Sequence, residues 1–118
     1  MTKPRPRGPS PEVLNARRIV DLLELRAAGK PDEVVYTYLH DDGADPRTLT
    51  FGQLFDDAQR VATLLLEHVN PGDRAILLFG SGLDFVLAFR GCQVAGVVPV
   101  PVMPPRSAEP ADLGRVMA

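Results

Sequence analysis

The stretch that decides the fold is residues 73–102, DRAILLFGSGLDFVLAFRGCQVAGVVPVPV. Its first apolar run, 75–79, shows no alternation with polar residues, which is typical of a strand covered on both faces. Gly80-Ser81-Gly82 then predicts a turn into a helix over Leu83–Ala95, and a second apolar run follows at 97–102. Strand, helix and strand in this order form a βαβ unit. We therefore expect a parallel pair of strands with a right-handed crossover.

Two prolines constrain the last strand of this unit. Pro99 and Pro101 are two residues apart, so their missing N–H groups fall on the same edge of the strand. The strand can donate fully only through its other edge, from the valines that alternate with the prolines. The sequence therefore predicts that the valine edge pairs with 75–79 and that the proline edge lies at a sheet edge or a bulge.

The residues near the start of the chain predict a helix. Apolar residues recur at helical spacing over Pro11–Ala28. Ser10 is the expected N-cap, because its hydroxyl can accept from a free N–H group of the first turn. Gly29 is the expected left-handed C-cap, and Pro31 is expected to prevent the helix from continuing.

A hairpin and a second helix are expected next. Val34–Leu39 is β-branched and aromatic, which predicts a strand, and Asp41-Asp42-Gly43 is a turn signal. Arg47–Thr50 would be a short returning strand. Thr50 and Gln53 have the spacing of a capping box, so they predict the start of a helix whose apolar stripe continues behind them.

Composition excludes several classes of protein. The chain has 118 residues and a formal net charge of −2, which argues against a nucleic-acid binder or a binder of anionic membranes. Cys92 is the only cysteine, so neither an internal disulfide nor a multi-cysteine zinc site can form. The longest uncharged run, Gly91–Pro105, contains four prolines and is shorter than the roughly 18 apolar residues that a spanning helix needs. We expect a cytoplasmic protein.

The candidate phosphate-binding feature is the turn at 80–82, because phosphate loops lie between a strand and a helix. A dinucleotide fingerprint would need a third glycine where Phe85 stands. A Walker loop would need the sequence Gly-Lys-Ser or Gly-Lys-Thr after the strand, and the only lysines of the chain are Lys3 and Lys30. The geometry of a tight turn explains these glycines without a ligand.

The other reactive side chains form no catalytic or metal-binding pattern. Neither His40 nor His68 is spaced to pair with Cys92 or with a carboxylate, and Cys92 falls on an apolar stripe where a buried, inert thiol is expected. Asp41, Asp42 and Asp45 do not form a calcium loop of the EF-hand type, because the glutamate needed at the twelfth position of such a loop is absent. The sequence therefore assigns no catalytic, cofactor-binding or metal-binding residue to this chain.

The order of short motifs resembles a known superfamily. Motifs similar to the opening of adenylate-forming enzymes are Ile19–Leu23, Pro31-Asp32, Val35–Leu39, Leu49–Phe51 with Gln53-Leu54, Pro71–Arg74, Gly82–Phe85 and Phe89. Within that superfamily, Gly91–Pro101 running into Pro104-Pro105-Arg106 is most similar to the fatty-acyl-AMP ligases. The resemblance covers Leu14 to Arg106. Pro104, Pro105 and Arg106 are a signature of the subfamily, with no role that the residues themselves reveal.

The resemblance implies a fold and an activity. The fold is α/β, a partial parallel sheet with a βαβ crossover and flanking helices, as the N-terminal piece of the adenylate-forming enzyme fold. Such ligases use ATP and Mg²⁺ to convert a fatty acid to an acyl-adenylate, then pass the acyl group to an acyl carrier protein of a polyketide or peptide synthase. The family's phosphate loop and catalytic lysine would lie beyond this sequence, so the chain alone is expected to be inactive and to need the C-terminal remainder of the ligase. The alternative is a non-catalytic interaction module derived from the same fold.

Three segments are expected along the chain. Residues 1–10 are basic and proline-rich, which predicts a disordered arm. Residues 11–106 form the N-terminal segment of the AMP-binding domain. Residues 107–118 are interpreted as the truncated start of a further helix.

Overall fold

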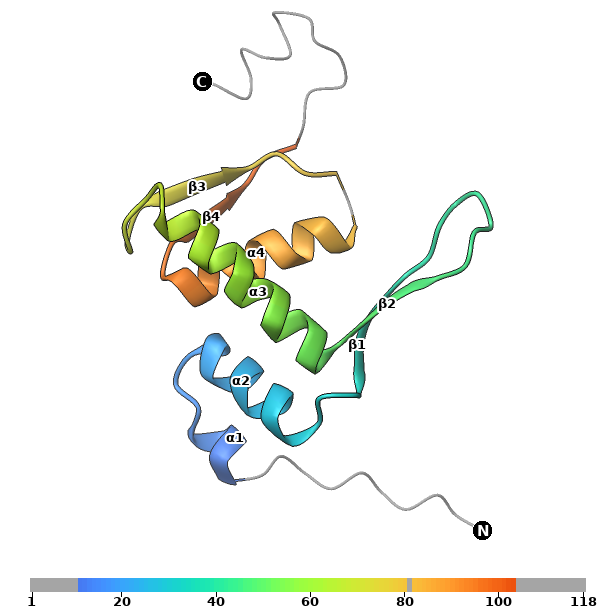
Figure 1. Cartoon of the computed structure of the whole chain (residues 1–118), viewed down its shortest axis with the longest axis horizontal. Helices are drawn as coiled ribbons and strands as arrows, with labels where there is room; N and C mark the ends of the chain where they lie inside the picture. Colours follow the sequence, from blue (N-terminus) through green and yellow to red (C-terminus); the bar gives the residue numbers. More distant parts are fainter. Residues whose placement is uncertain (1–10, 81, 104–118) are drawn as a thin grey trace, which may run out of the picture.

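The structure is a computed structural model, which describes residues 11–80 and 82–103 (Figure 1). Its helices and strands follow one another in the order α1 (Pro11–Asn15), α2 (Ile19–Gly29), β1 (Val34–Tyr38), β2 (Arg47–Thr50), α3 (Phe51–Leu66), β3 (Arg74–Leu77), α4 (Leu83–Ala95) and β4 (Val98–Pro101). The expectations for the N-terminal arm at 1–10, for Ser10 as an N-cap and for a helix start at 107–118 fall outside the described residues.

The predicted βαβ unit is present. β3 and β4 pair in parallel, with Arg74 opposite Val98 and Leu77 opposite Pro101, and α4 connects them. α4 covers the predicted residues and ends at Gly96, which adopts the left-handed conformation (φ 73°) that a residue with a Cβ takes up only at a cost. The α/β class expected from the sequence is confirmed.

The prolines of β4 act as the sequence predicts. The N–H of Val98 donates to the carbonyl of Asp73 at 2.7 Å, and the N–H of Val102 donates to the carbonyl of Leu77 at 3.1 Å. Both donors, one at the start of β4 and one just after its end, lie on the side that faces β3. In the described part of the chain the sheet has only these two strands, so Pro99 and Pro101 lie along an unpaired edge.

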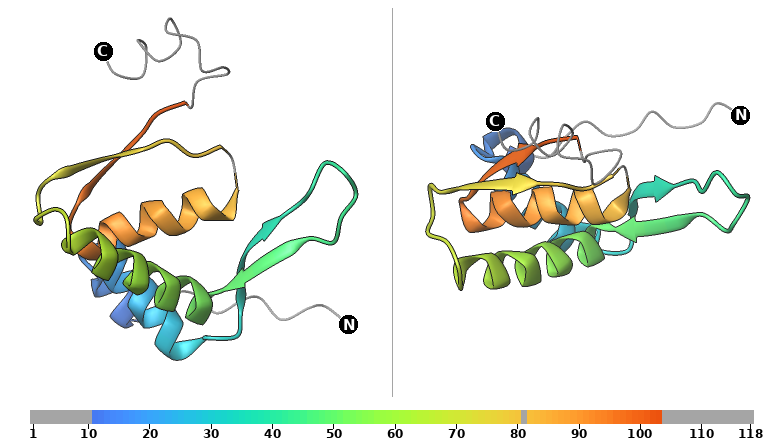
Figure 2. Two further views of the ribbon diagram at one scale, coloured as in Figure 1. Left: turned by 45° about the horizontal axis from the view of Figure 1, so that its top comes forward. Right: turned by 90° about the horizontal axis from the view of Figure 1, so that it is seen from above.

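α4 and α3 lie on the same side of the β3–β4 sheet. Viewed from above, the sheet, α4 and α3 form successive layers (Figure 2). The core between these layers is a cluster of buried residues: Ala62, Leu77, Cys92, Ala95 and Val97. A second cluster joins α2 and the hairpin to the same helices and contains Leu23, Leu49, Leu54 and Leu83.

The opposite face of the sheet differs from the expectation of a strand covered on both faces. Ile76 and Val98 have exposed fractions of 59% and 46%, and Leu78, just after β3, has 49%. Side chains alternate along a strand, so Leu77 points to α4 while Ile76 points away from it. Among the described residues, the helices that pack on this sheet cover one face only.

The α3–α4 crossing depends on a glycine. A Cβ atom on Gly91 would lie 2.6 Å from Val61 Cβ and 3.3 Å from the carbonyl oxygen of Ala58, and closer still to Val61 Cγ1. Real Cβ atoms do not approach other atoms so closely. The absence of a side chain at this position therefore allows the two helices to approach to their observed distance.

The hairpin and the capping box are also confirmed. β1 and β2 pair antiparallel, and Gly43 adopts a φ of 79° at the tip. The N–H of Gln53 donates to Thr50 Oγ1 at 3.2 Å, and the N–H of Thr50 donates to Gln53 Oε1 at 3.0 Å. Two free donors at the start of α3 are satisfied in this way.

The expectation of one helix over Pro11–Ala28 is wrong. The chain forms α1 and α2 instead, and Arg18, between them, has extended backbone angles (φ −124°, ψ 151°). Arg18 Nη2 contacts Asp21 Oδ1 at 2.8 Å, and this hydrogen bond and charge hold the pKa of the Asp21 carboxyl below its usual value. The extended backbone at Arg18 separates the two helices, and the Asp21 carboxylate is favourable beside the free N–H groups of the first turn of α2.

The expectation of a left-handed cap at Gly29 is also wrong. Gly29 is the last residue of α2, and Lys30 is the C-cap, with φ −139° and its N–H donating to the carbonyl of Arg26 at 2.8 Å. Pro31 explains the difference, because a residue that precedes proline is kept out of the helical region. The helix therefore ends through Lys30 without a left-handed residue.

We predict that Gly91→Ala lowers the free energy of unfolding by about 1–3 kcal/mol, since the new methyl group would overlap Val61. Gly29→Ala is the matched control, because a Cβ at that helical position meets no atom within 4 Å. The control should leave stability unchanged or raise it by up to about 1 kcal/mol. Urea unfolding followed by circular dichroism measures both. Equal effects of the two substitutions would show that the helix crossing does not depend on Gly91.

Candidate functional site

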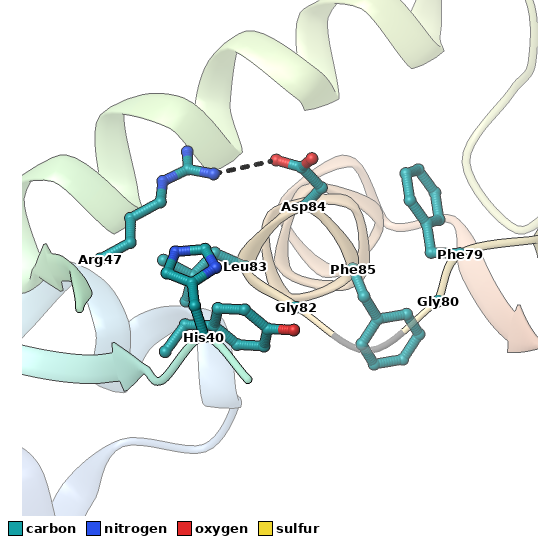
Figure 3. A pocket seen from close by; sticks show the side chains of 9 residues that line it. His40, Arg47, Phe79, Gly80, Gly82, Leu83, Asp84 and Phe85 are labelled. Atoms are coloured by element: carbon teal, nitrogen blue, oxygen red, sulfur yellow. Dashed lines mark ion pairs between the residues drawn. The ribbon is translucent and has the colours of Figure 1, made fainter. Parts of the chain in front are cut away.

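The larger of two described cavities lies where the β1–β2 hairpin meets the start of α4 (Figure 3). Its volume is about 260 Å³. The lining residues are Tyr38, His40, Arg47, Phe79, Gly80, Gly82, Leu83, Asp84 and Phe85. The cavity thus brings the turn that the sequence analysis weighed as a phosphate loop next to a histidine and an arginine from the hairpin.

Gly82 sets the direction in which α4 leaves this turn. It is the N-cap of α4, with φ 147°, and no side chain caps the helix there. A Cβ on Gly82 would come no closer than 3.9 Å to the Tyr38 ring, so there is room for a side chain. Glycine is therefore required here by the backbone conformation and not by a lack of space. Ser81 lies outside the described residues.

The charges at this helix start are already matched. Asp84 is in the first turn of α4, where a carboxylate is favourable, and its Oδ1 lies 3.5 Å from Arg47 Nη1. Both side chains are more than half exposed, so the pair contributes only about 0–1 kcal/mol. A carboxylate at this position would repel a phosphate that approached the same N–H groups.

The three reactive side chains singled out in the sequence lie in three different parts of the molecule. His40 lines the cavity, and its ring meets the Tyr38 ring edge-on with centroids 5.0 Å apart. His68 lies just after α3, and its N–H donates to the carbonyl of Leu65 at 2.9 Å. Cys92 is part of the core between α4 and the sheet. The structure therefore assembles no nucleophile–base pair from them.

Cys92 is the buried thiol that the apolar stripe predicts. It has no exposed surface, and burial raises the pKa of the thiol above its usual value. A thiol is reactive as its thiolate, so burial both shields this sulfur and keeps it protonated. This prediction is confirmed.

A second, smaller cavity of about 180 Å³ lies between α2, β1, α3 and α4 and contains the side chain that the sequence analysis missed. Arg90, on its wall, donates to the Tyr36 hydroxyl at 3.1 Å and to Gln93 Oε1 at 2.8 Å. The guanidinium also lies 6.0 Å from the centre of the Phe89 ring. The sequence does contain a signal for this residue, because Arg90 is the only charged residue between Phe85 and Val102. Through it, α4 is linked to β1.

Within 11–80 and 82–103, no three His, Cys, Asp or Glu side chains are grouped to hold a metal ion. Over the same ranges, none of the helices combines the length and the apolar character needed to cross a bilayer.

Comparison with known proteins places this fold in a family. The sequence profile described as "AMP-binding enzyme" matches residues 23–115, which is more than half of the chain. The chain belongs to this family. The match begins within α2, at residue 23, and includes the hairpin, α3 and the whole βαβ unit.

The relatives of this chain are much longer proteins. It is 39% identical to Disco-interacting protein 2 of Drosophila melanogaster over 74% of this chain and 5% of the relative. It is 32% identical to a medium-chain-fatty-acid–[acyl-carrier-protein] ligase of Moorena producens, over 84% of this chain and 16% of the relative. The crystal structure of a fatty acid AMP ligase from Legionella pneumophila superposes with a TM-score of 0.81 and 37% identity, covering 92% of this chain and 18% of that one.

These comparisons confirm the family resemblance seen in the sequence. The chain is similar to the N-terminal portion of fatty acid AMP ligases and spans less than a fifth of the length of each of these three relatives. Pro104, Pro105 and Arg106 lie within the matched range but outside the described residues. That they are a signature of the subfamily stays a prediction.

We predict that Cys92 of the folded chain does not react with a thiol-specific reagent such as dithionitrobenzoate at pH 8, and reacts completely in urea. The reason is that the sulfur has no exposed surface and a raised pKa. The absorbance of the released thiolate measures the reaction, with the urea-unfolded chain as the internal control. Rapid labelling of the native protein would contradict the assignment of Cys92 to the core.

Proposed function

We propose that this chain is the N-terminal α/β segment of a fatty-acyl-AMP ligase. The complete enzyme would use ATP and Mg²⁺ to convert a fatty acid to an acyl-adenylate. The observation that carries the proposal is the superposition on the Legionella fatty acid AMP ligase, because it combines 37% identity with a TM-score of 0.81 over 92% of this chain. Fold and sequence therefore point to the same subfamily.

In this proposal the segment supplies a scaffold, and the chemistry takes place elsewhere in the enzyme. The larger cavity offers a histidine, an exposed arginine–aspartate pair and a helix start that carries a carboxylate. This arrangement provides neither an activated nucleophile nor a set of cations for a triphosphate. ATP and Mg²⁺ would be bound by the rest of the enzyme, and the 118-residue chain alone would catalyse no adenylation.

The acceptor of the acyl group is proposed to be an acyl carrier protein, in a polyketide or a similar synthase. The support is the ligase of Moorena producens, whose name gives an acyl carrier protein as its acceptor. The net charge of −2 adds no basic surface that would suggest a nucleic acid or an anionic membrane instead. A cytoplasmic enzyme is part of the same proposal.

A second candidate is a non-catalytic interaction module that kept the fold. It is favoured by the 39% identity to a relative whose name describes it as a Disco-interacting protein. An interaction module would need an exposed surface suited to a partner, and the open face of the β3–β4 sheet with Ile76 and Val98 is such a surface.

A chimeric enzyme distinguishes the two candidates. The matching segment of the Legionella ligase is replaced by this chain, and exchange of pyrophosphate into ATP is measured with and without a fatty acid. We predict that the chimera keeps fatty-acid-dependent exchange within about tenfold of the parent enzyme, a difference of about 1.4 kcal/mol in activation free energy. The 118-residue chain alone should show no exchange above background.

Two controls are needed to interpret the exchange measured with the chimera. A fatty alcohol, which lacks the carboxylate that is adenylated, should support no exchange. The melting temperature of the chimera should match that of the parent, which shows that the chimera is folded. A folded chimera without exchange would contradict the ligase proposal and favour the interaction module.

A further inference from the structure

One face of the β3–β4 sheet is apolar and is covered by no described helix. We define the open sheet face by Ile76, Leu78 and Val98, whose exposed fractions are 59%, 49% and 46%. α3 and α4 both lie on the other side of the sheet (Figure 2). Parallel sheets are found with both faces covered, so an uncovered apolar face on this sheet calls for a partner.

The two edges of the same sheet are not equivalent. At the β4 edge, Pro99 and Pro101 have no N–H to donate, which blocks a regular ladder on that side. At the β3 edge, the situation is the opposite. The bonds from Val98 to Asp73 and from Val102 to Leu77 use odd-numbered carbonyls, one just before β3 and one at its end. The alternation of the ladder therefore turns the N–H and C=O groups of Ile76 away from β4.

We propose that the open sheet face and the outer edge of β3 form one docking surface for the remainder of the AMP-binding fold. That remainder adds a strand beside β3, and never beside β4, and it covers Ile76 and its neighbours with apolar side chains. This inference rests on the proposed function, because it takes the partner to be the rest of a ligase. It goes further by naming the surface and the edge at which the partner binds.

The comparison with the Legionella ligase identifies this occupant over others. This chain covers 18% of that protein yet superposes with a TM-score of 0.81, so most of the matched enzyme lies outside the part described here. A second copy of this chain would have to pair β3 with β3 around a two-fold axis, which gives antiparallel strands. The existing pair is parallel, and such a two-fold pairing would not supply a further parallel strand, which favours a different segment as the occupant.

Two exposed side chains provide a matched test. Ile76 on the open sheet face and Leu64 on α3 have the same exposed fraction, 59%. In the 118-residue chain, we expect Ile76→Asp and Leu64→Asp to shift the melting temperature by equally small amounts. In the Legionella chimera, Ile76→Asp should lower the melting temperature by at least about 3 °C more than Leu64→Asp, because an unpaired carboxylate would be buried.

Hydrogen exchange of backbone amides tests the edge separately. The Ile76 amide should exchange at least about 100-fold more slowly in the chimera than in the 118-residue chain, since a new strand would accept its hydrogen bond. A chimera that fails to fold with Ile76→Asp but folds with Leu64→Asp supports the proposal as well.

Other outcomes overturn it. Equal shifts for the two variants in the chimera, or an Ile76 amide that exchanges equally fast in both proteins, would show that the rest of the ligase does not cover this surface. A 118-residue chain that is dimeric, becomes monomeric with Ile76→Asp, and shows no excess shift in the chimera would identify a second copy as the occupant. These readouts do not involve adenylation, so a folded but inactive chimera would contradict the proposed function alone.

Discussion

The contact between α3 and α4 at Gly91 is the constraint on which the layered structure depends. The missing side chain lets α4 approach Val61 and the carbonyl of Ala58. This close crossing places Cys92 and Ala95 where they can pack against Leu77 of the sheet. A wider crossing would leave a gap in this cluster, and lost packing contacts cannot be replaced by rotation of side chains as small as alanine and cysteine.

Polar groups connect the two core clusters. Arg90 leaves α4 beside the first cluster and donates to Tyr36, which packs on the second. The carbonyls of Pro31 and Glu33 accept from the first N–H groups of α3, those of Gly52 and Phe51, at 2.9 and 3.0 Å. The loop after α2 is thereby fixed to the start of α3, so the N-terminal helices and the hairpin share one framework with the βαβ unit.

Local chemistry made much of this fold predictable from the sequence. The uninterrupted apolar runs predict buried strands, Gly96 allows the left-handed end of α4, and the alternating prolines leave β4 one edge for pairing, so the βαβ unit follows from them. The break before α2 was missed because the apolar stripe continues through it, and the exposed local pair of Arg18 and Asp21, three residues apart, does not interrupt that stripe.

The candidate site was less accessible to sequence reasoning than the fold. The turn at Gly82 could be located, and so could Cys92. The approach of Arg47 to Asp84 could not, because it joins residues of two separate units whose relative position no local pattern encodes. The open sheet face could not be predicted for a related reason. An apolar run shows that a strand favours burial, but it does not show which other elements of the chain cover that strand.

The tip of the β1–β2 hairpin has a consequence for how such a segment can vary. Its bonds are local, from the Gly43 N–H to the His40 carbonyl and from the Ala44 N–H to Asp42 Oδ1, and it projects away from the helices (Figure 1). Lengthening a solvated loop of this kind costs only a slowly growing closure entropy. Insertions between Asp42 and Asp45 can therefore accumulate, or carry an added epitope, without disturbing the layers that hold the segment together.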